Sequence, residues 1–413
     1  MLISIAISSL KDRRGAVIMT LLSIIVSVSL LLSVELIRQQ AKDSFGRTVS
    51  GVDLIVGART GQINLLLYSV FRMGNPSNNI SWESYEAIMQ SPSVAWSIPM
   101  SLGDSHRGYR VLGTTSTYFD HFKYGNKQPL VFSSGSPFDS PFTLVLGADV
   151  AKQLGYSLND QIVLSHGVGH TSFHHHDHSP FTVSGILAPT GTPVDQTLHV
   201  SLQGIEIMHM SESDAHAMQQ EWRLNQRVEL QPDAISAAML GLNSKIQALQ
   251  LQRTINQYES EALMAILPGV ALAELWKLVG NVENILLLIS IFILFSSMMG
   301  MATMLLTSIR ERQREFAILR AIGAGPMTIF WLIQAEALLI SLLASIIAVS
   351  LVWLGIQFSN EWLSHEFGLF IDNTVLSSHS LLIVLFVCAM SLIIACIPAI
   401  NAYRNTLHRG LSN

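Results

Sequence analysis

The chain has 413 residues, of which 49% are hydrophobic and only 13% are charged. Because soluble domains carry about 25% charged residues, this composition favours a protein that lies in a bilayer over one with a larger soluble core. The net charge of -5 and the absence of a long basic run argue against nucleic-acid binding. The two cysteines, Cys388 and Cys396, lie in one apolar run near the C-terminus, so they cannot crosslink a water-exposed domain.

Four apolar stretches are long enough to cross a membrane, because a hydrocarbon core about 30 Å thick needs roughly 20 helical residues. The first is longer than the apolar core of a signal peptide, and Glu35 and Arg38 continue its helical pattern, so we expect an uncleaved anchor. The four predicted spans cover residues 16–40, 281–308, 327–358 and 380–403.

Basic residues beside these spans predict their orientation. Basic clusters precede the first span, follow the second and follow the fourth, whereas the segment between spans three and four, residues 359–379, has no Lys or Arg. Cytoplasmic flanks are enriched in Lys and Arg. We therefore expect residues 1–15, 309–326 and 404–413 in the cytoplasm, and residues 41–280 and 359–379 outside.

The large external segment alternates predicted strands with predicted helices, which indicates a compact α+β domain inserted between the first and second spans. Strand patterns occupy Phe142–Gly147, Gln161–Ser165, Phe181–Leu187 and Leu198–Leu202, and Tyr109–Phe119 alternates before it turns. Helical patterns occupy Ala148–Leu154, Ala234–Tyr258 and Ala271–Val282. The last of these runs into the second span without a strong breaker, so we expect a continuous stalk that could transmit motion; an ordinary helical overshoot is the alternative.

The segment after the second span carries charges of alternating sign at helical spacing. Arg310 and Arg314 share one helix face, and Glu311 and Glu315 share another, which predicts a short salt-bridged helix on the cytoplasmic side. The sequence AIGAGP, residues 321–326, should end it. Such a helix suits docking to a soluble partner, and equally it suits a position among lipid headgroups.

This segment resembles the signature of the FtsX/MacB/LolC permeases, the membrane subunits of a class of ABC transporters. The pattern S-x-x-E-R-x-x-E-x-x-x-x-R-A-x-G-A is carried by Ser308, Glu311, Arg312, Glu315, Arg320, Ala321, Gly323 and Ala324. Weaker similarities follow the family's order elsewhere in the chain, at Gly113-Thr114 with Tyr118-Phe119, Leu146-Gly147, Val183–Leu187 and Pro398-Ala399.

The resemblance implies a bacterial inner-membrane protein with four transmembrane helices, both termini in the cytoplasm and a large α+β periplasmic domain. It further implies a second permease protomer, a separate cytoplasmic ABC ATPase that binds ATP, and a periplasmic partner protein. The sequence has no G-x-x-x-x-G-K-[ST] segment, so we expect ATP hydrolysis on the partner chain and no cofactor on this one. The expected ATPase-coupling residues are Arg310, Glu311, Arg312, Glu315, Arg320, Gly323 and Ala324.

Two readings of this family remain open. In the first, ATP-driven motion does mechanical work in the periplasm, as in MacB and LolC-like permeases. In the second, the chain is an FtsX-like signalling subunit that controls a periplasmic enzyme. An enzymatic role for the chain itself is not expected, because the sequence has neither a nucleophile elbow nor an H-E-x-x-H pair.

Within the predicted spans, one acidic residue stands out. Glu336 lies about ten residues into the third span, and a charge near the centre of a bilayer costs about 2.5–3.5 kcal/mol. We expect it to be paired or protonated and to serve helix packing or coupling. In the second span, Ser296 and Gly300 have the small-x-x-x-small spacing that lets another helix approach closely.

A histidine-rich tract interrupts the external domain between two predicted strands. Imidazole and carboxylate groups are ligands for zinc and related metals, yet neighbouring histidines beside glycines do not form a rigid site. A solvated loop without a role is the alternative to a zinc-linked transporter function. The candidate metal ligands are His166, His170, His174, His175, His176, Asp177 and His178.

Overall fold

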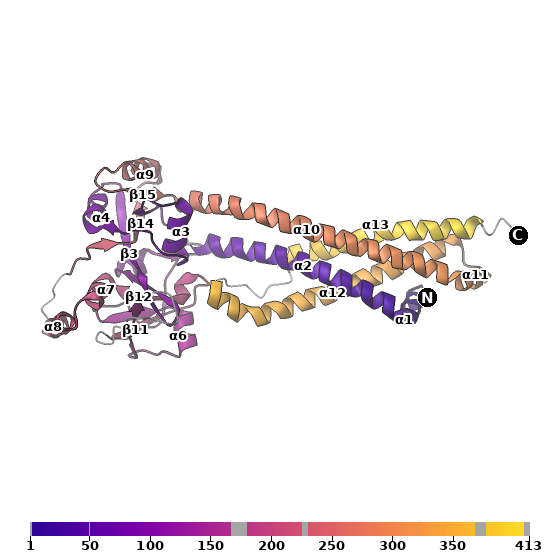
Figure 1. Cartoon of the computed structure of the whole chain (residues 1–413), viewed down its shortest axis with the longest axis horizontal. Helices are drawn as coiled ribbons and strands as arrows, with labels where there is room; N and C mark the ends of the chain where they lie inside the picture. The colour runs from indigo at the N-terminus through magenta and orange to yellow at the C-terminus, as the bar shows by residue number, and fades with distance from the viewer. Residues whose placement is uncertain are drawn as a thin grey trace. The chain divides into compact units, whose positions relative to one another are not determined.

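The computed structural model describes residues 2–48, 50–166, 180–224, 230–321, 323–367 and 377–408. The chain divides into two units. A helical unit contains Met1–Ala41, Val279–His365 and Ile371–Asn413. A mixed α/β unit contains Lys42–Leu278 with Glu366–Phe370. Each unit is treated separately below, with the element labels of Figure 1.

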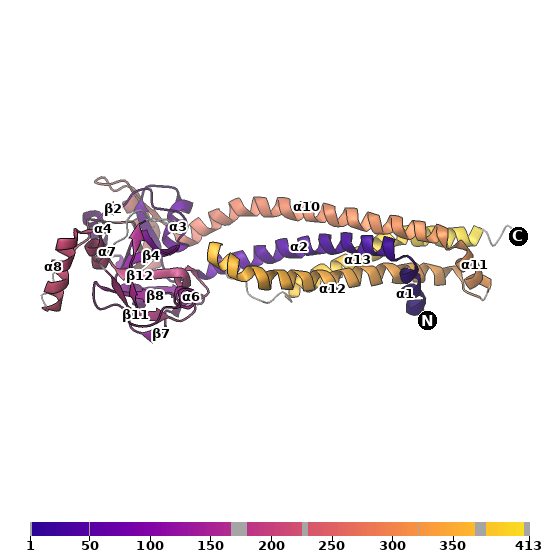
Figure 2. The same cartoon turned by 60° about the horizontal axis from the view of Figure 1, so that its bottom comes forward.

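The helical unit contains four helices that are long and apolar enough to cross a membrane, which confirms the predicted four-span architecture. They run side by side in both cartoon views (Figures 1 and 2). Two shorter helices, α1 (Leu2–Asp12) and α11 (Gln313–Ala321), accompany them. The long helices are α2 (Arg14–Thr48), α10 (Pro268–Glu311), α12 (Pro326–Phe367) and α13 (Ser378–His408).

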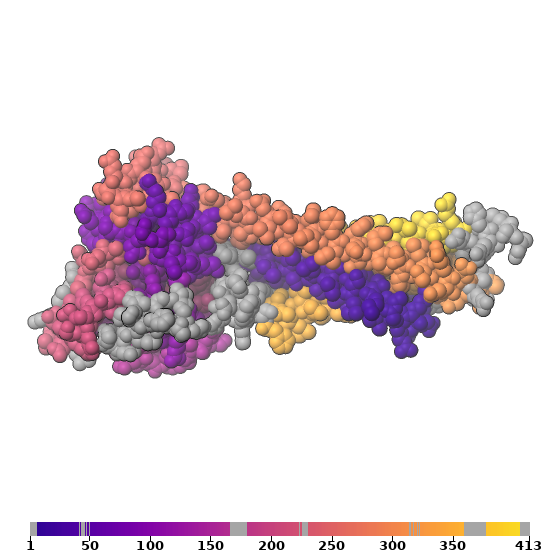
Figure 3. Space-filling model, viewed as in Figure 1, coloured from indigo at the N-terminus to yellow at the C-terminus, as the bar shows by residue number. Residues whose placement is uncertain are grey.

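The interior of the bundle is lined by Ala, Val, Leu, Ile and Met side chains, including Val28, Met298, Met301 and Ala344. Its outward faces carry large apolar residues, and Phe292 on α10 is 65% exposed. Figure 3 shows the atoms of α10 uncovered along one face of the helical unit. Long helices that expose large apolar side chains on their outward faces are typical of a bundle packed in lipid, so the structure is that of a multi-pass membrane protein.

Two long helices extend beyond the apolar runs from which they were predicted. Helix α10 begins at Pro268 and is unbroken to Glu311, which confirms the helical continuity expected of Ala271–Val282. Helix α12 continues past the predicted span to Phe367, so the first nine residues of the segment expected to connect spans three and four are helical. The physical reason is that SNEWLSHEF contains no Pro or Gly, and a helix ends at a breaker rather than where hydrophobicity falls.

The α/β unit is built on a mixed sheet. Strands β4 and β12 are parallel neighbours, as are β8 and β11, and the other pairings are antiparallel. Strand β9 (Gln161–Ile162) pairs with β11, and β10 (Ser165–His166) pairs with β3. The main strand order is β15 (Leu263–Ile266), β1 (Leu54–Ala58), β14 (Ala237–Leu242), β3 (Val94–His106), β4 (Tyr109–Thr114), β12 (Thr197–Ser201), β8 (Thr143–Leu146), β11 (Phe181–Leu187) and β7 (Phe132–Gly135).

Helices cover both faces of this sheet and enclose separate apolar clusters, one around Tyr118 and Met239 and others around Leu240 and Leu144. Together the sheet and helices confirm the predicted α+β domain. Two-stranded pairs join β2 (Ile80–Ser81) to β13 (Ala234–Ile235) and β5 (Lys123–Tyr124) to β6 (Gln128–Pro129). The helices are α3 (Gln62–Val70), α4 (Trp82–Met89), α5 (Thr117–His121), α6 (Ala148–Leu154), α7 (Leu202–His209), α8 (Glu212–Arg223) and α9 (Ala248–Asn256), with short 3-10 turns at Pro193–Gln196 and Lys245–Gln247.

The prediction of helix across Ala234–Tyr258 is wrong at its start. Residues 234–242 form β13 and β14, and helix begins only near Ala248. The sequence AISAAMLGL is rich in helix formers, but β14 is paired on both sides, with β1 and with β3. Burial between two strands overrides the intrinsic preference of Ala, Met and Leu.

Candidate functional site

Both helix breaks at the N-terminal end of α2 and the C-terminal end of α10 fall on an arginine. Arg13 lies between α1 and α2, and Arg312 lies between α10 and α11. The backbone stays helical in its hydrogen bonding at the second break, where the Phe316 N–H donates to the Arg312 carbonyl. Each arginine therefore sits at a joint between two helices, with a side chain free to reach a third.

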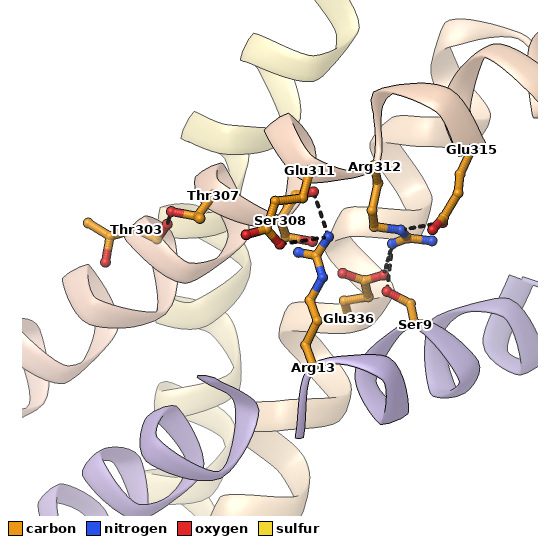
Figure 4. A network of polar contacts seen from close by, with 9 residues as sticks. All are labelled: Ser9, Arg13, Thr303, Thr307, Ser308, Glu311, Arg312, Glu315 and Glu336. Atoms are coloured by element: carbon orange, nitrogen blue, oxygen red, sulfur yellow. Dashed lines mark hydrogen bonds and ion pairs between the residues drawn. The ribbon is translucent and has the colours of Figure 1, made fainter. Parts of the chain in front are cut away.

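Arg312 connects three separate helices (Figure 4). Its Nη1 donates to Oε1 of Glu336 on α12 at 2.8 Å and to the Ser9 hydroxyl on α1 at 2.6 Å. Its Nε donates to Oε2 of Glu315 on α11 at 2.6 Å. The guanidinium carbon also lies 5.2 Å from the centre of the buried Phe316 ring, within range of a cation–π contact.

The Arg312–Glu336 pair is buried, with side chains only 7% and 3% exposed. Removing one member of a buried ion pair costs about 3–5 kcal/mol, because the other charge is left without compensation. The pairing agrees with the prediction that Glu336 is paired or protonated. Because Arg312 lies between α10 and α11 and bonds Ser9 of α1 as well as Glu336 of α12, the pair is a structural joint among these helices.

Arg13 makes a second, more exposed joint. Its Nη2 donates to the Ser308 carbonyl of α10 at 2.9 Å and lies 3.3 Å from Oε2 of Glu311. The Glu311 side chain is mostly exposed, so this ion pair is screened by water and contributes at most about 1 kcal/mol. The link to the Ser308 carbonyl nevertheless holds the α1–α2 turn against the end of α10, as Figure 4 shows.

Helix α11 ends at a glycine cap. Gly323 has φ +101°, a left-handed conformation that glycine adopts without the steric cost of a side chain. The Ala324 N–H donates to the Leu319 carbonyl at 2.9 Å, which is the long bond of a Schellman cap. Pro326 then begins α12, where its missing N–H has no cost. The Gly-Ala pair in the signature therefore has a conformational reason.

The structure divides the predicted coupling residues into buried and exposed sets. Arg312 is buried, whereas Arg310, Glu311 and Glu315 are exposed, and Gly323 and Ala324 form the cap. The backbone of Arg320 belongs to α11, but its side chain lies outside the described set.

Ser296 and Gly300 lie on an exposed face of α10. A Cβ atom at Gly300 would meet nothing within 4 Å, so within the described part of this chain no helix uses the predicted close approach. One residue further on, Ser297 instead bonds the Ser27 hydroxyl of α2 at 2.5 Å. The face that carries Ser296 and Gly300 is therefore open.

Most of the predicted metal ligands, namely His170, His174, His175, His176, Asp177 and His178, lie outside the described residues. His166 is the last residue of β10, and its backbone is in register with Asp104 on β3. Among the residues that the structure describes, no group of three or more His, Cys, Asp or Glu side chains could hold a metal ion.

Sequence reasoning did not assign Ser9 or Arg13 to the site. Arg13 belongs to the basic cluster that precedes the first span, which was used only to predict orientation, and α1 was not predicted as a separate helix. The available signal was the run KDRRG, which places a helix-weakening Gly and several charges between two apolar runs.

Comparisons with known proteins agree with this architecture. The model of the FtsX-like permease C-terminal region matches residues 287–407, and that of the MacB-like periplasmic core domain matches residues 17–257. No curated protein gives a significant match.

Two solved structures are similar to part of the chain. The periplasmic region of MacB from Actinobacillus actinomycetemcomitans is 10% identical, with a TM-score of 0.34, and the match covers 55% of this chain and 94% of that one. The extracellular domain of the noncanonic ABC-type transporter YknZ from Gram-positive bacteria is 13% identical, with a TM-score of 0.30 and coverages of 52% and 99%.

The MacB-like family model alone matches more than half of the sequence, and the FtsX-like model accounts for the last three spans. The chain belongs to the FtsX/MacB-like family of ABC transporter permeases.

Proposed function

We propose that the chain is the permease subunit of a MacB/LolC-like ABC transporter, which couples a separate cytoplasmic ATPase to conformational work in the periplasm. The observation that carries this proposal is the buried Arg312–Glu336 pair, which fixes the start of α11 to α12. On this account the chain is not itself an enzyme, and ATP is bound and hydrolysed by its partner.

Helix α11 has the surface expected of a docking element. Phe316 is buried beneath it, while the acidic side chains of Glu311 and Glu315 are exposed. Ile318 of the same helix is 64% exposed. An exposed apolar residue on a helix that also carries an exposed charge favours contact with a protein surface over contact with lipid tails alone.

Arg312 offers a route by which force on α11 can reach the membrane helices. Its bonds to Ser9 and Glu336 connect α11 to α1 and α12 without an intervening flexible segment. The same joint is the end of α10, an unbroken helix of 44 residues, or about 66 Å. Because an α-helix resists axial deformation, a displacement at Glu311 would be carried along the whole of α10.

The remaining parts of the proposal concern topology and assembly. On this proposal both termini and α11 lie on the cytoplasmic side of a bacterial inner membrane and the α/β unit lies in the periplasm, an orientation that the basic residues beside the spans favour. The open face of α10 at Ser296 and Gly300 suits close packing against a second permease protomer, identical or related.

The test is association with the ATPase. The full chain, purified from its native membrane, should retain an ABC ATPase, and Glu311→Arg should release most of it. Glu212→Arg reverses an exposed charge on α8 in the α/β unit and serves as the matched control. Retention of the ATPase by Glu311→Arg and Arg320→Glu alike would remove the docking role assigned to α11.

Two alternative functions are also proposed. An FtsX-like signalling subunit would use the same joint to control a periplasmic enzyme, and it differs only in what responds outside. A zinc-linked transporter component would instead use the histidine tract, whose first residue, His166, ends β10 and is in register with Asp104 of β3.

A further inference from the structure

A pocket of about 660 Å³ lies between the start of α2 and the end of α10, within the helical unit. The uncharged run of α2 begins directly after Arg14, and that of α10 ends directly before Arg310. Because the charged ends of membrane spans lie among the lipid headgroups, the pocket is at the level where a headgroup can enter it. Its α2 wall contains Ala16 and Thr20, and its α10 wall contains Thr303, Met304 and Thr307.

Two charged residues of opposite sign line this pocket at the turn between the first two helices. Asp12 ends α1 and Arg14 begins α2, and both are exposed. Within the described part of the chain, neither side chain makes a hydrogen bond or an ion pair. The pocket therefore offers one carboxylate and one guanidinium to a ligand that itself carries both a cation and an anion.

The threonine hydroxyls of the pocket are oriented as acceptors. The Thr20 hydroxyl donates to the Ala16 carbonyl at 2.9 Å. On successive turns of α10 in Figure 4, the Thr303 hydroxyl donates to the Gly300 carbonyl at 2.8 Å and that of Thr307 to the Thr303 carbonyl at 3.0 Å. A hydroxyl has one hydrogen and two lone pairs. With each hydrogen donated within its own helix, the lone pairs that remain favour a ligand with N–H or O–H donors.

These groups distinguish among the common phospholipid headgroups. All of them carry a phosphate, which a guanidinium such as that of Arg14 can bind through two hydrogen bonds. A primary ammonium adds three N–H donors, which match the Asp12 carboxylate and the threonine lone pairs. A choline group has a positive charge but no N–H donor, and a glycerol group would leave the Asp12 carboxylate without a cation. The combination therefore favours phosphoethanolamine.

We propose that this pocket binds the phosphoethanolamine headgroup of a membrane phospholipid, with the phosphate on Arg14 and the ammonium between Asp12 and Thr307. Exposed apolar side chains of α2, such as Met19 at 72% exposure, offer a contact surface for the acyl chains. This inference goes beyond the coupling function, since it assigns the helical unit a ligand of its own. It requires only that α2 and α10 cross a membrane.

The test is native mass spectrometry of the full chain, released from a neutral detergent after titration with lipid. The probes are phosphatidylethanolamine, phosphatidylcholine and phosphatidylglycerol with identical acyl chains. One phosphatidylethanolamine should bind per chain, about fivefold or more tightly than either other lipid. Arg14→Gln should weaken the binding of all three, because they share the phosphate. Asp12→Asn should weaken that of phosphatidylethanolamine alone and so remove the preference.

Lys11→Gln is the matched control for Arg14→Gln, because Lys11 is an exposed cation of α1 outside the pocket lining. It should bind lipid like the unmodified chain, and all variants should keep the same thermal unfolding midpoint within a few degrees. Equal or tighter binding of phosphatidylcholine or phosphatidylglycerol by the unmodified chain would overturn the proposal. So would equal losses in Lys11→Gln and Arg14→Gln, or displacement of the lipid by an equal concentration of soluble phosphoethanolamine, which would indicate a site for the free headgroup.

Discussion

Nη1 of Arg312 lies 2.8 Å from Oε1 of Glu336, although 24 positions separate the two residues and a helix break lies between them. The two side chains join the end of α10 to α12 in the part of the chain that carries the family signature.

Replacing Glu336 with Gln should destabilise the helical unit by about 3–5 kcal/mol, because the buried Arg312 guanidinium loses its buried counter-charge and keeps only the mostly exposed carboxylate of Glu315. The midpoint of thermal unfolding of the full chain in detergent measures this loss. Glu315→Gln removes a carboxylate that bonds the same guanidinium but is mostly exposed, so its cost should stay within about 1 kcal/mol.

Replacing both members of the pair with apolar residues of similar size, as in Arg312→Met with Glu336→Leu, should recover most of the stability lost in Glu336→Gln. It should not recover coupling to the ATPase. Equal destabilisation by Glu336→Gln and Glu315→Gln would show that the pair does not act as a buried joint.

The external domain should lose stability in acid through His199. Burial, together with the charge of Arg72, lowers the pKa of His199 to about 3. The unfolded chain binds a proton below about pH 6.5, whereas the folded chain does not do so until about pH 3. The stability contributed by the neutral imidazole is therefore full above pH 6.5, and it falls by about 1.4 kcal/mol for each pH unit between about pH 6.5 and pH 3.

The variant His199→Asn should be less stable at pH 7.5 but should show a shallower loss between pH 6.5 and 4. Unfolding of the full chain followed by intrinsic fluorescence gives both slopes, and His216→Asn on the exposed face of α8 is the control. If His199→Asn and the unmodified chain had parallel pH profiles, the neutral buried imidazole would not be the source of the acid sensitivity.

Gly241 in β14 should not tolerate a side chain. A Cβ atom there would overlap the indole of Trp96, whose ring is stacked on His121 with centroids 4.9 Å apart. Gly241→Ala should therefore destabilise the domain by about 1–3 kcal/mol through overpacking. Gly103→Ala, in strand β3, meets nothing within 4 Å and should be nearly neutral in the same denaturation assay.

If the histidine tract binds zinc as part of the protein's function, the full chain should bind zinc with a dissociation constant below about 10 µM in calorimetry. Replacing His174, His175, His176 and His178 with Asn should abolish most of that binding. Replacement of His209, which is outside the tract, should leave it unchanged. Zinc affinity that is weaker than this, or that persists without the four histidines, would reduce the tract to a solvated loop.

The membrane helices were predictable because lipid imposes one requirement, a long apolar helix, which composition alone reveals. The strand Phe181–Leu187 and the helix Ala148–Leu154 were found because their local patterns agree with their tertiary surroundings. Residues 237–242 were not predicted as a strand, because their local preference is helical and only pairing with β1 and β3 makes them a strand.

The candidate site was predictable only in part. A carboxylate at position 336 within an apolar run must be paired or protonated, and this much follows from solvation alone. Its partner could not be identified, because Arg310, Arg312, Arg314 and Arg320 are equivalent in charge. Which arginine points inward depends on the break between α10 and α11, and the contribution of Ser9 depends on how α1 packs.

In the proposed function, ATP turnover on a partner chain changes the α/β unit through the Arg312–Glu336 joint. Hydrogen–deuterium exchange of the permease–ATPase complex in nanodiscs, with and without ATP, tests it most directly. We predict ATP-dependent exchange in the α/β unit of the unmodified chain, and loss of that response in Glu336→Gln while the ATPase remains bound. Exchange in the α/β unit that is the same with and without ATP in the unmodified complex would contradict the account.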